Sequence, residues 1–322
     1  MNRINWIDWA KALGILLVVM GHSQYSNENI VHMIFMIHMP LFFFISGYLY
    51  NKKGIKELHI SNWNSLLLPY LAYNLAFALF IVFSRVIKLL LGEEVDWIYS
   101  FVNPLYHTVF GIANGIFDGP TWFLLALVWC KYISYLLHKS DKKYIKIIIV
   151  FLSVVLFVIR QFSDTQFPLA IDCALVGFIW FELGHLIKAM QIKFPFYAWF
   201  IFAPIGFWSC YKIFLFNGQC NYMIADVKGF LGLLGTGMGI AAFFSVCKIL
   251  GKYNSCVIVH ISQASIVIMC LHMMIQAPME TITHYQNGLL TTFTGDLLIV
   301  LTLTAIYPLL KKYIPALTGR RK

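Results

Sequence analysis

The stretch KALGILLVVMGH, residues 11–22, places a cation and an imidazole at the two ends of an apolar run. Ten residues, all of them apolar or glycine, separate Lys11 from His22. An α-helix rises about 1.5 Å and turns about 100° per residue, so Lys11 and His22 share one helix face about 16 Å apart. Asp8 lies one turn before Lys11 on the same stripe. This spacing predicts a membrane helix that forms one wall of a functional site.

The composition indicates an integral membrane protein. Of the 322 residues, 60% are hydrophobic and 12% are charged, whereas a soluble domain has about 25% charged residues. Apolar runs recur along the whole chain, which predicts an all-α polytopic bundle in one membrane-embedded domain over residues 1–322. The ten expected spans are residues 5–24, 29–50, 63–91, 120–138, 146–162, 168–187, 195–216, 229–247, 261–279 and 289–310.

Two places interrupt this regular pattern. Pro69 lies in the long third span, where it predicts a bend. The segment 98–119 is apolar but contains Pro104 and several glycines, which predicts an outer loop or a re-entrant piece.

The distribution of Lys and Arg predicts the orientation of the bundle. Seventeen of the 24 basic residues lie at the two termini and in alternate loops of one side, whereas five lie on the opposite side or at its helix ends. Because positive charge collects in cytoplasmic loops, we expect both termini in the cytoplasm. The net charge of +10 is then a topology signal. We therefore expect a multi-pass protein of the inner (plasma) membrane, surrounded by lipids and without a nucleic-acid partner.

The seven cysteines show no CxxC or other metal-type spacing. The sequence therefore predicts neither a disulfide nor a metal site.

Ionisable residues inside the expected spans mark the candidate site, because such groups are costly in a bilayer. The connector between the first two spans is short, which predicts an antiparallel hairpin that lets His22 and His38 approach each other. The structural alternative is that His22 makes hydrogen bonds at the interface and that Lys11 extends its side chain to the surface.

Three motifs resemble the integral membrane acyltransferase 3 family, and within it the fucose 4-O-acetylase-like branch. The family has a basic residue, ten positions and a histidine in its first span, which Lys11 and His22 match, although arginine is commoner at the first position. The Phe-Phe-x-x-Ser-Gly motif of the second span is matched by residues 42–47. A weaker similarity is SIVIMCLH at residues 265–272, which ends in His272.

The resemblance implies an enzyme that transfers an acyl group, commonly acetyl, to a hydroxyl of an extracytoplasmic or lipid-linked carbohydrate. Cytosolic acyl-CoA is then a co-substrate, and no bound cofactor is expected. Lys11 is expected to bind a CoA phosphate with Asp8 holding the lysine, and His22 to act as the general base. The alternative is a transporter that uses buried His, Asp and Lys residues as a proton or substrate path.

The remaining candidate positions have both functional and structural interpretations. His38 either orients His22, contacts the acceptor or donates to the oxyanion, or it only bonds a neighbouring helix. Ser46 is interpreted as permitting close helix approach in preference to acting as a catalytic serine. Trp122 either stacks on a sugar or belongs to an interfacial aromatic belt. The other candidates are Asp172 as an acceptor contact, Glu182 as a CoA contact or a solvated interface residue, and His272 as a site residue or a core histidine.

Overall fold

The computed structural model describes residues 3–319 except 24–27, 52–53, 140–143, 145–146, 149–150, 152–153, 156–157, 161, 164–165 and 192–193. In this part of the chain the regular structure is helical, apart from one isolated bridge between Asn221 and Asp226. Eight of the helices described are long and apolar enough to cross a membrane. The expected class of an all-α polytopic membrane protein is therefore confirmed.

The chain folds into two compact units. Unit 1 comprises residues 1–51, 178–222 and 226–309, and unit 2 comprises residues 52–177, 223–225 and 310–322. The expectation of one membrane-embedded domain over residues 1–322 stays a prediction.

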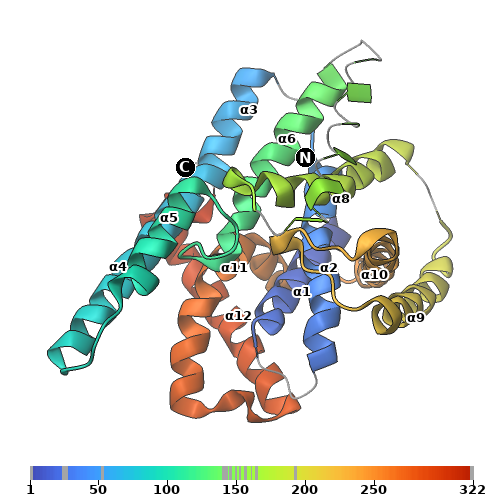
Figure 1. Ribbon diagram of the computed structural model, residues 1–322. Coiled ribbons are helices and arrows are strands. Elements are labelled where there is room, and N and C mark those ends of the chain that lie inside the picture. The colour runs from blue at the N-terminus through green and yellow to red at the C-terminus, as the bar shows by residue number, and fades with distance from the viewer. Residues whose placement is uncertain are drawn as a thin grey trace. The chain divides into compact units, whose positions relative to one another are not determined.

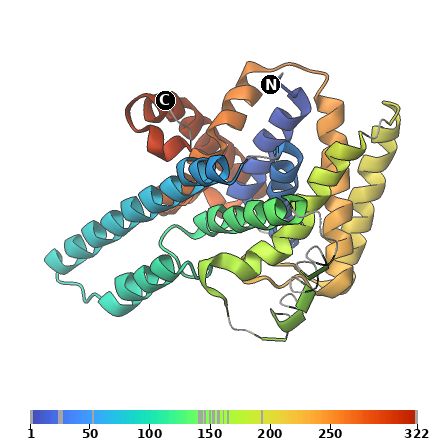
Figure 2. The same cartoon turned by 90° about the horizontal axis from the view of Figure 1, so that it is seen from above.

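The helices described in unit 1 come from three stretches of the chain. They are α1 (Asn5–Gly21), α2 (Glu28–Leu49), most of α8 (Ile171–Met190), α9 (Ala198–Asn217), α10 (Gly229–Leu250), α11 (Cys256–Thr283), η6 (Tyr285–Asn287) and most of α12 (Leu289–Tyr313). Helix α1 packs against α2, α10 and α11, and α9 lies beside α10 (Figures 1 and 2). With 17 residues, α1 has the minimum length of a membrane helix.

The start of α1 is tied to the end of α10. The Asn5 side chain donates to the carbonyls of Gly251 at 2.6 Å and Tyr253 at 2.9 Å. The Lys248 ammonium lies 4.4 Å from the centre of the Trp6 ring. The beginning of α1 and the end of α10 are therefore at the same level of the bundle, as the alternating loops of the sequence predict.

Glycines bring α2 and α8 into backbone contact. A Cβ added at Gly47 would lie 1.8 Å from the Phe181 carbonyl oxygen, and one added at Gly184 would lie 2.1 Å from that of Phe44. Only glycine fits at both places, because neither backbone has room for a side chain. The second-span motif thus sets the distance between two helices of unit 1.

The elements of unit 2 range from 3 to 23 residues in length. They are α3 (Ile55–Asn62), η1 (Trp63–Leu67), α4 (Leu68–Leu90), η2 (Ile98–Val102), α5 (Asn103–Phe110), η3 (Gly119–Thr121), α6 (Trp122–Lys139), η4 (Pro168–Ala170) and η7 (Pro315–Thr318), and η5 (Tyr222–Ile224) joins it at the boundary with unit 1. The π-helical turn η1 ends directly before α4, whose second residue is Pro69. The bend expected at Pro69 stays a prediction.

Some of the expected spans agree with the observed helices at both ends, and others do not. Helices α2 and α6 begin and end within two residues of the spans 29–50 and 120–138. The span 261–279 is too short, because α11 begins after Ser255, whose hydroxyl accepts from the Ile258 N–H. Eight of the 17 residues of the span 146–162 lie outside the described residues, so this span stays a prediction.

The segment 98–119 is partly helical, which differs from the expected irregular piece. Its first part forms η2 and α5, which lie beside α4 (Figures 1 and 2). Pro104 lies in the first turn of α5. The N–H groups of a first turn have no partner within the helix, so a proline there costs no helix hydrogen bond. Gly111 ends the helix with a φ of 64°.

We expect Gly47→Ala to destabilise the protein by about 1–3 kcal/mol, because the methyl group must push α8 away from α2. The measurement is the thermal unfolding midpoint of the detergent-solubilised protein. Gly54→Ala is the matched control, since nothing lies within 4 Å of a Cβ at Gly54. Equal midpoints for the two variants would contradict the backbone contact.

Candidate functional site

Three histidines from three helices of unit 1 gather around one place. The ring centre of His22, directly after α1, lies 5.1 Å from that of His272 on α11. Phe35 on α2 lies 6.0 Å from His22 and 5.2 Å from His38, and so links the two rings. His38 is 2% exposed and His272 is 0% exposed, whereas the His22 side chain is exposed. The structure therefore combines one accessible imidazole with two buried ones.

The hydrogen bonds of the buried histidines define their tautomers. His38 Nδ1 lies 2.7 Å from the Ile34 carbonyl oxygen, and His272 Nδ1 lies 3.0 Å from that of Ile268. Because a carbonyl oxygen only accepts, each Nδ1 carries the hydrogen, and in the neutral rings each Nε2 presents a lone pair. His38 in this form accepts a hydrogen bond, so orienting His22 or contacting an acceptor hydroxyl fits it better than donation to an oxyanion.

The second nitrogen of His272 is a buried acceptor. Among the residues described, nothing donates a hydrogen bond to His272 Nε2. Such atoms are rare in folded proteins and indicate a place for a bound group. In the same part of the chain, no group of three or more His, Cys, Asp and Glu side chains is placed to hold a metal ion.

A buried polar network adjoins the histidines. The Ser23 hydroxyl donates to Asp296 Oδ1 on α12 at 2.6 Å. The Gln276 amide on α11 lies 2.9 Å from the Ser23 hydroxyl and donates to the Val19 carbonyl of α1 at 2.9 Å. The Tyr285 hydroxyl lies 3.4 Å from Asp296 Oδ1. Asp296 is 0% exposed, so its carboxylate depends on these donors in place of water.

This network fixes the end of α1 that carries His22. Ser23 directly follows His22, and Gln276 lies one turn after His272 on α11. The sequence analysis did not select Asp296, although it is the one carboxylate in the span 289–310. The general cost of ionisable residues in a membrane was the signal that could have identified it.

Asp8 and Lys11 lie on α1, one turn apart, and a continuous helix separates Lys11 from His22. Asp8 Oδ2 accepts from Arg3 Nε at 2.6 Å, and Asp8 Oδ1 accepts from the Ser262 hydroxyl at 2.7 Å. The hydrogen bond to Asp8 raises the pKa of Arg3 above its ordinary value. The carboxylate therefore joins the segment before α1 to α11, at the end of α1 opposite to His22.

Two further candidates of unit 1 lie away from the histidine rings. Ser46 is partly exposed on α2, next to the glycine at which α2 meets α8. Glu182 is partly exposed on α8, one turn before His185, whose ring centre lies 5.9 Å from that of Tyr50. The proposed roles of Ser46 and Glu182 stay predictions.

Asp172 and Trp122 belong to unit 2. Asp172 Oδ2 forms an ion pair with Arg160 Nε at 3.3 Å, and both side chains are buried. Arg160 also donates to the Ile224 carbonyl at 2.5 Å. Trp122 is 4% exposed at the start of α6. The observed contacts of Asp172 and Trp122 are thus inside the protein, and their roles toward an acceptor stay predictions.

One comparison with known proteins gives a match. The model of the acyltransferase domain of the acyltransferase 3 family matches residues 4–311. No curated protein and no solved structure matches the chain.

We expect Ser23→Ala to lower the free energy of unfolding by about 1.5–3 kcal/mol, because Asp296 loses the donor at 2.6 Å. The thermal unfolding midpoint in detergent measures this loss. Ser265→Ala is the matched control, since the Ser265 hydroxyl donates to Ser262 of its own helix. A midpoint for Ser23→Ala no lower than the control would mean that the network does not hold the end of α1.

Proposed function

The chain belongs to the acyltransferase 3 family and is a multi-pass membrane acyltransferase, and from this premise we propose its donor, its acceptor and its base. The donor is acyl-CoA from the cytosol, commonly acetyl-CoA. The acceptor is a hydroxyl of an extracytoplasmic or lipid-linked carbohydrate, and His22 is the general base. The protein lies in the inner (plasma) membrane with both termini in the cytoplasm. The similarity to the fucose 4-O-acetylase-like branch stays a prediction.

The observation that carries this proposal is the accessible His22 ring beside the buried His272 ring, whose Nε2 has no donor among the residues described. A sugar hydroxyl is a poor nucleophile until a base removes its proton. Imidazole has an ordinary pKa near 6.5, which makes it a suitable base at neutral pH. A carbohydrate also brings several hydroxyl donors, and one of them can satisfy His272 Nε2.

The proposed transfer is direct. The hydroxyl oxygen attacks the thioester carbonyl carbon while His22 takes the hydroxyl proton. The tetrahedral intermediate then breaks its carbon–sulfur bond, and the leaving thiolate takes the proton from the His22 imidazolium. The products are the carbohydrate ester and free CoA, and His22 is neutral again. The Nε2 lone pairs of His38 and His272 support this step by accepting hydrogen bonds from acceptor hydroxyls.

Lys11 is proposed to bind a phosphate of the donor. Lys11 and His22 share one face of α1 and are separated by about 16 Å along its axis. An extended CoA molecule suits this separation, because its phosphates and its thioester lie at opposite ends. The charge asymmetry of the loops supports an orientation with the Lys11 end of α1 toward the cytosol, where acyl-CoA is found.

We expect His22→Ala to reduce acyl transfer by about 10²–10⁴-fold while the protein still folds, because the side chain is accessible and little buried volume is lost. His22→Gln is expected to be equally inactive, because a glutamine side chain forms hydrogen bonds but does not take up a proton. The measurement is the incorporation of labelled acetyl into membrane carbohydrate.

The matched control is His260→Ala, because His260 is an exposed histidine like His22 but bonds only the carbonyl of Cys256 and lies outside the histidine group. Substantial transfer by a well-folded His22→Ala protein would rule out His22 as the base. Partial activity of His22→Gln would limit the role of His22 to positioning.

We expect Lys11→Ala to raise the KM for acyl-CoA about tenfold or more, because a charge-assisted contact with a phosphate is lost. Lys11→Arg is expected to retain the KM, since the arginine keeps the charge. Both are measured in inside-out vesicles, which expose the cytoplasmic face to added acyl-CoA. An unchanged KM in the alanine variant would leave Lys11 as a structural residue, and transfer in right-side-out vesicles only would reverse the proposed orientation.

A further inference from the structure

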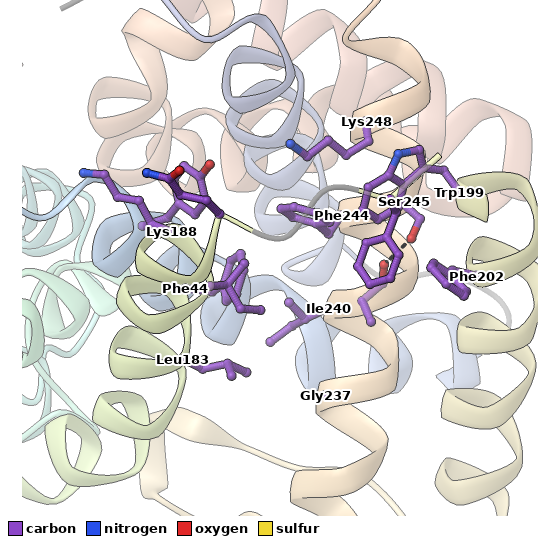
Figure 3. A pocket seen from close by; sticks show the side chains of 15 residues that line it. Phe44, Leu183, Lys188, Trp199, Phe202, Gly237, Ile240, Phe244, Ser245 and Lys248 are labelled. Carbon is purple, nitrogen blue, oxygen red and sulfur yellow. Dashed lines mark hydrogen bonds between the residues drawn. The ribbon is translucent and has the colours of Figure 1, made fainter. Parts of the chain in front are cut away.

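A cavity of about 560 Å³ lies within unit 1, away from the three histidines. Side chains of α8 and α9 form its two sides, and α10 forms its back (Figure 3). We call this cavity the α8–α9 slot. Its main lining residues are Phe44, Leu183, Lys188, Trp199, Phe244 and Lys248.

Two lysines stand at one end of the slot. Lys188 donates to the Asn51 side chain at 2.8 Å, and Lys248 lies over the rings of Trp6 and Phe244 at 4.4 and 5.1 Å. In the described part of the chain, the Lys248 ammonium has no ion pair or hydrogen bond. The lining residues described include no Asp or Glu. This end of the slot therefore has positive charge that no carboxylate of the lining balances.

The rest of the slot is apolar. Phe44, Leu183, Phe202 and Ile240 line it below the lysines (Figure 3). The Ser245 hydroxyl donates to the Ala241 carbonyl of its own helix, so it is already hydrogen-bonded. The polar amides of a CoA arm would find few partners here, whereas a hydrocarbon chain needs none.

The helices beside the slot face lipid. Leu186 of α8 is 50% exposed, and Phe200 and Ile205 of α9 are 55% and 54% exposed. Apolar residues with this exposure on membrane helices contact the hydrocarbon of the bilayer. A lipid next to α8 and α9 therefore has direct access to the slot.

The depth of the slot matches one leaflet. Along α10 its lining extends from Lys248 to Gly237, which is about 16 Å of helix. Half of the hydrocarbon core of a bilayer is about 15 Å thick. Because Lys248 lies over Trp6, the charged end of the slot is level with the start of α1.

We propose that the α8–α9 slot binds an anionic phospholipid of the leaflet in which α1 begins. Its phosphate lies between Lys188 and Lys248, and one acyl chain runs along α10 toward Gly237. Basic pockets between membrane helices recognise anionic headgroups in this way. The proposal does not depend on the transferase reaction, since the slot and the histidines use different residues.

Native mass spectrometry of the delipidated protein, titrated with phosphatidylglycerol, tests the charged end. Each lysine is expected to contribute about fivefold in affinity, so Lys188→Gln with Lys248→Gln should weaken binding about 25-fold. The matched control is Lys212→Gln, because Lys212 lies 4.7 Å from the Trp208 ring but outside the slot. Phosphatidylethanolamine with the same chains is expected to bind less tightly than phosphatidylglycerol.

Gly237→Leu tests the apolar end. A Cβ at Gly237 meets only the Trp180 ring at an ordinary 3.4 Å, so the protein should fold with the leucine side chain filling the slot. This variant is expected to lose phosphatidylglycerol binding and to keep the wild-type unfolding midpoint. Undiminished binding in both the double lysine variant and Gly237→Leu would overturn the proposal. Displacement of the lipid by acetyl-CoA would also overturn it and would assign the slot to the donor.

Discussion

The burial of α1 among other helices is the constraint on which the rest of unit 1 depends. A membrane helix enclosed by α2, α10 and α11 has no water for its polar side chains, so each polar group needs a protein partner or a bound ligand. The polar residues of α1 accordingly stand at its two ends. Asp8 is held by Arg3 and Ser262 at one end, and Ser23 is held by Asp296 at the other. The apolar middle of α1 keeps these two polar places apart.

Close packing then sets the level at which the histidines meet. A Cβ at Gly14 would lie 3.1 Å from the Leu41 side chain, and one at Gly21 would lie 3.2 Å from that of Ile34. These small residues allow α2 to lie close against α1, and Gly47 brings α2 against α8. His38 is on the turn after Ile34, so the packing that seats Ile34 also places His38 beside the end of α1. The site is therefore a product of helix contacts as much as of the histidines themselves.

Local features of the fold could be predicted from the sequence, and contacts between distant helices could not. Hydrophobic length predicted α2 and α6 closely. The helix α5 was missed, because a proline in a first turn and a glycine at a helix end look like loop residues when their positions in the helix are unknown. Asp296 pairs with Ser23 across 273 residues, and no spacing in the sequence indicates such a partner. His272 and His22 are also far apart in the sequence, although their rings are neighbours in the structure. Only the family resemblance indicated that His272 could belong to the site.

The two ends of α1 also suit two different tasks. Trp6 and His22 are about 24 Å apart along the helix, which is most of the hydrocarbon thickness of a bilayer. At the Trp6 end, the Lys248 ammonium lies over the Trp6 and Phe244 rings, where the proposed phospholipid phosphate is bound, and Lys11 is the residue proposed for the donor. At the His22 end, the buried His272 Nε2 has no donor among the residues described, so a hydroxyl group suits this place. CoA carries several negative charges and is costly to move through the membrane, whereas the acyl group is small and uncharged. In the proposed mechanism, with the donor phosphate at Lys11 and the base at His22, only the acyl group has to cross the apolar middle of α1.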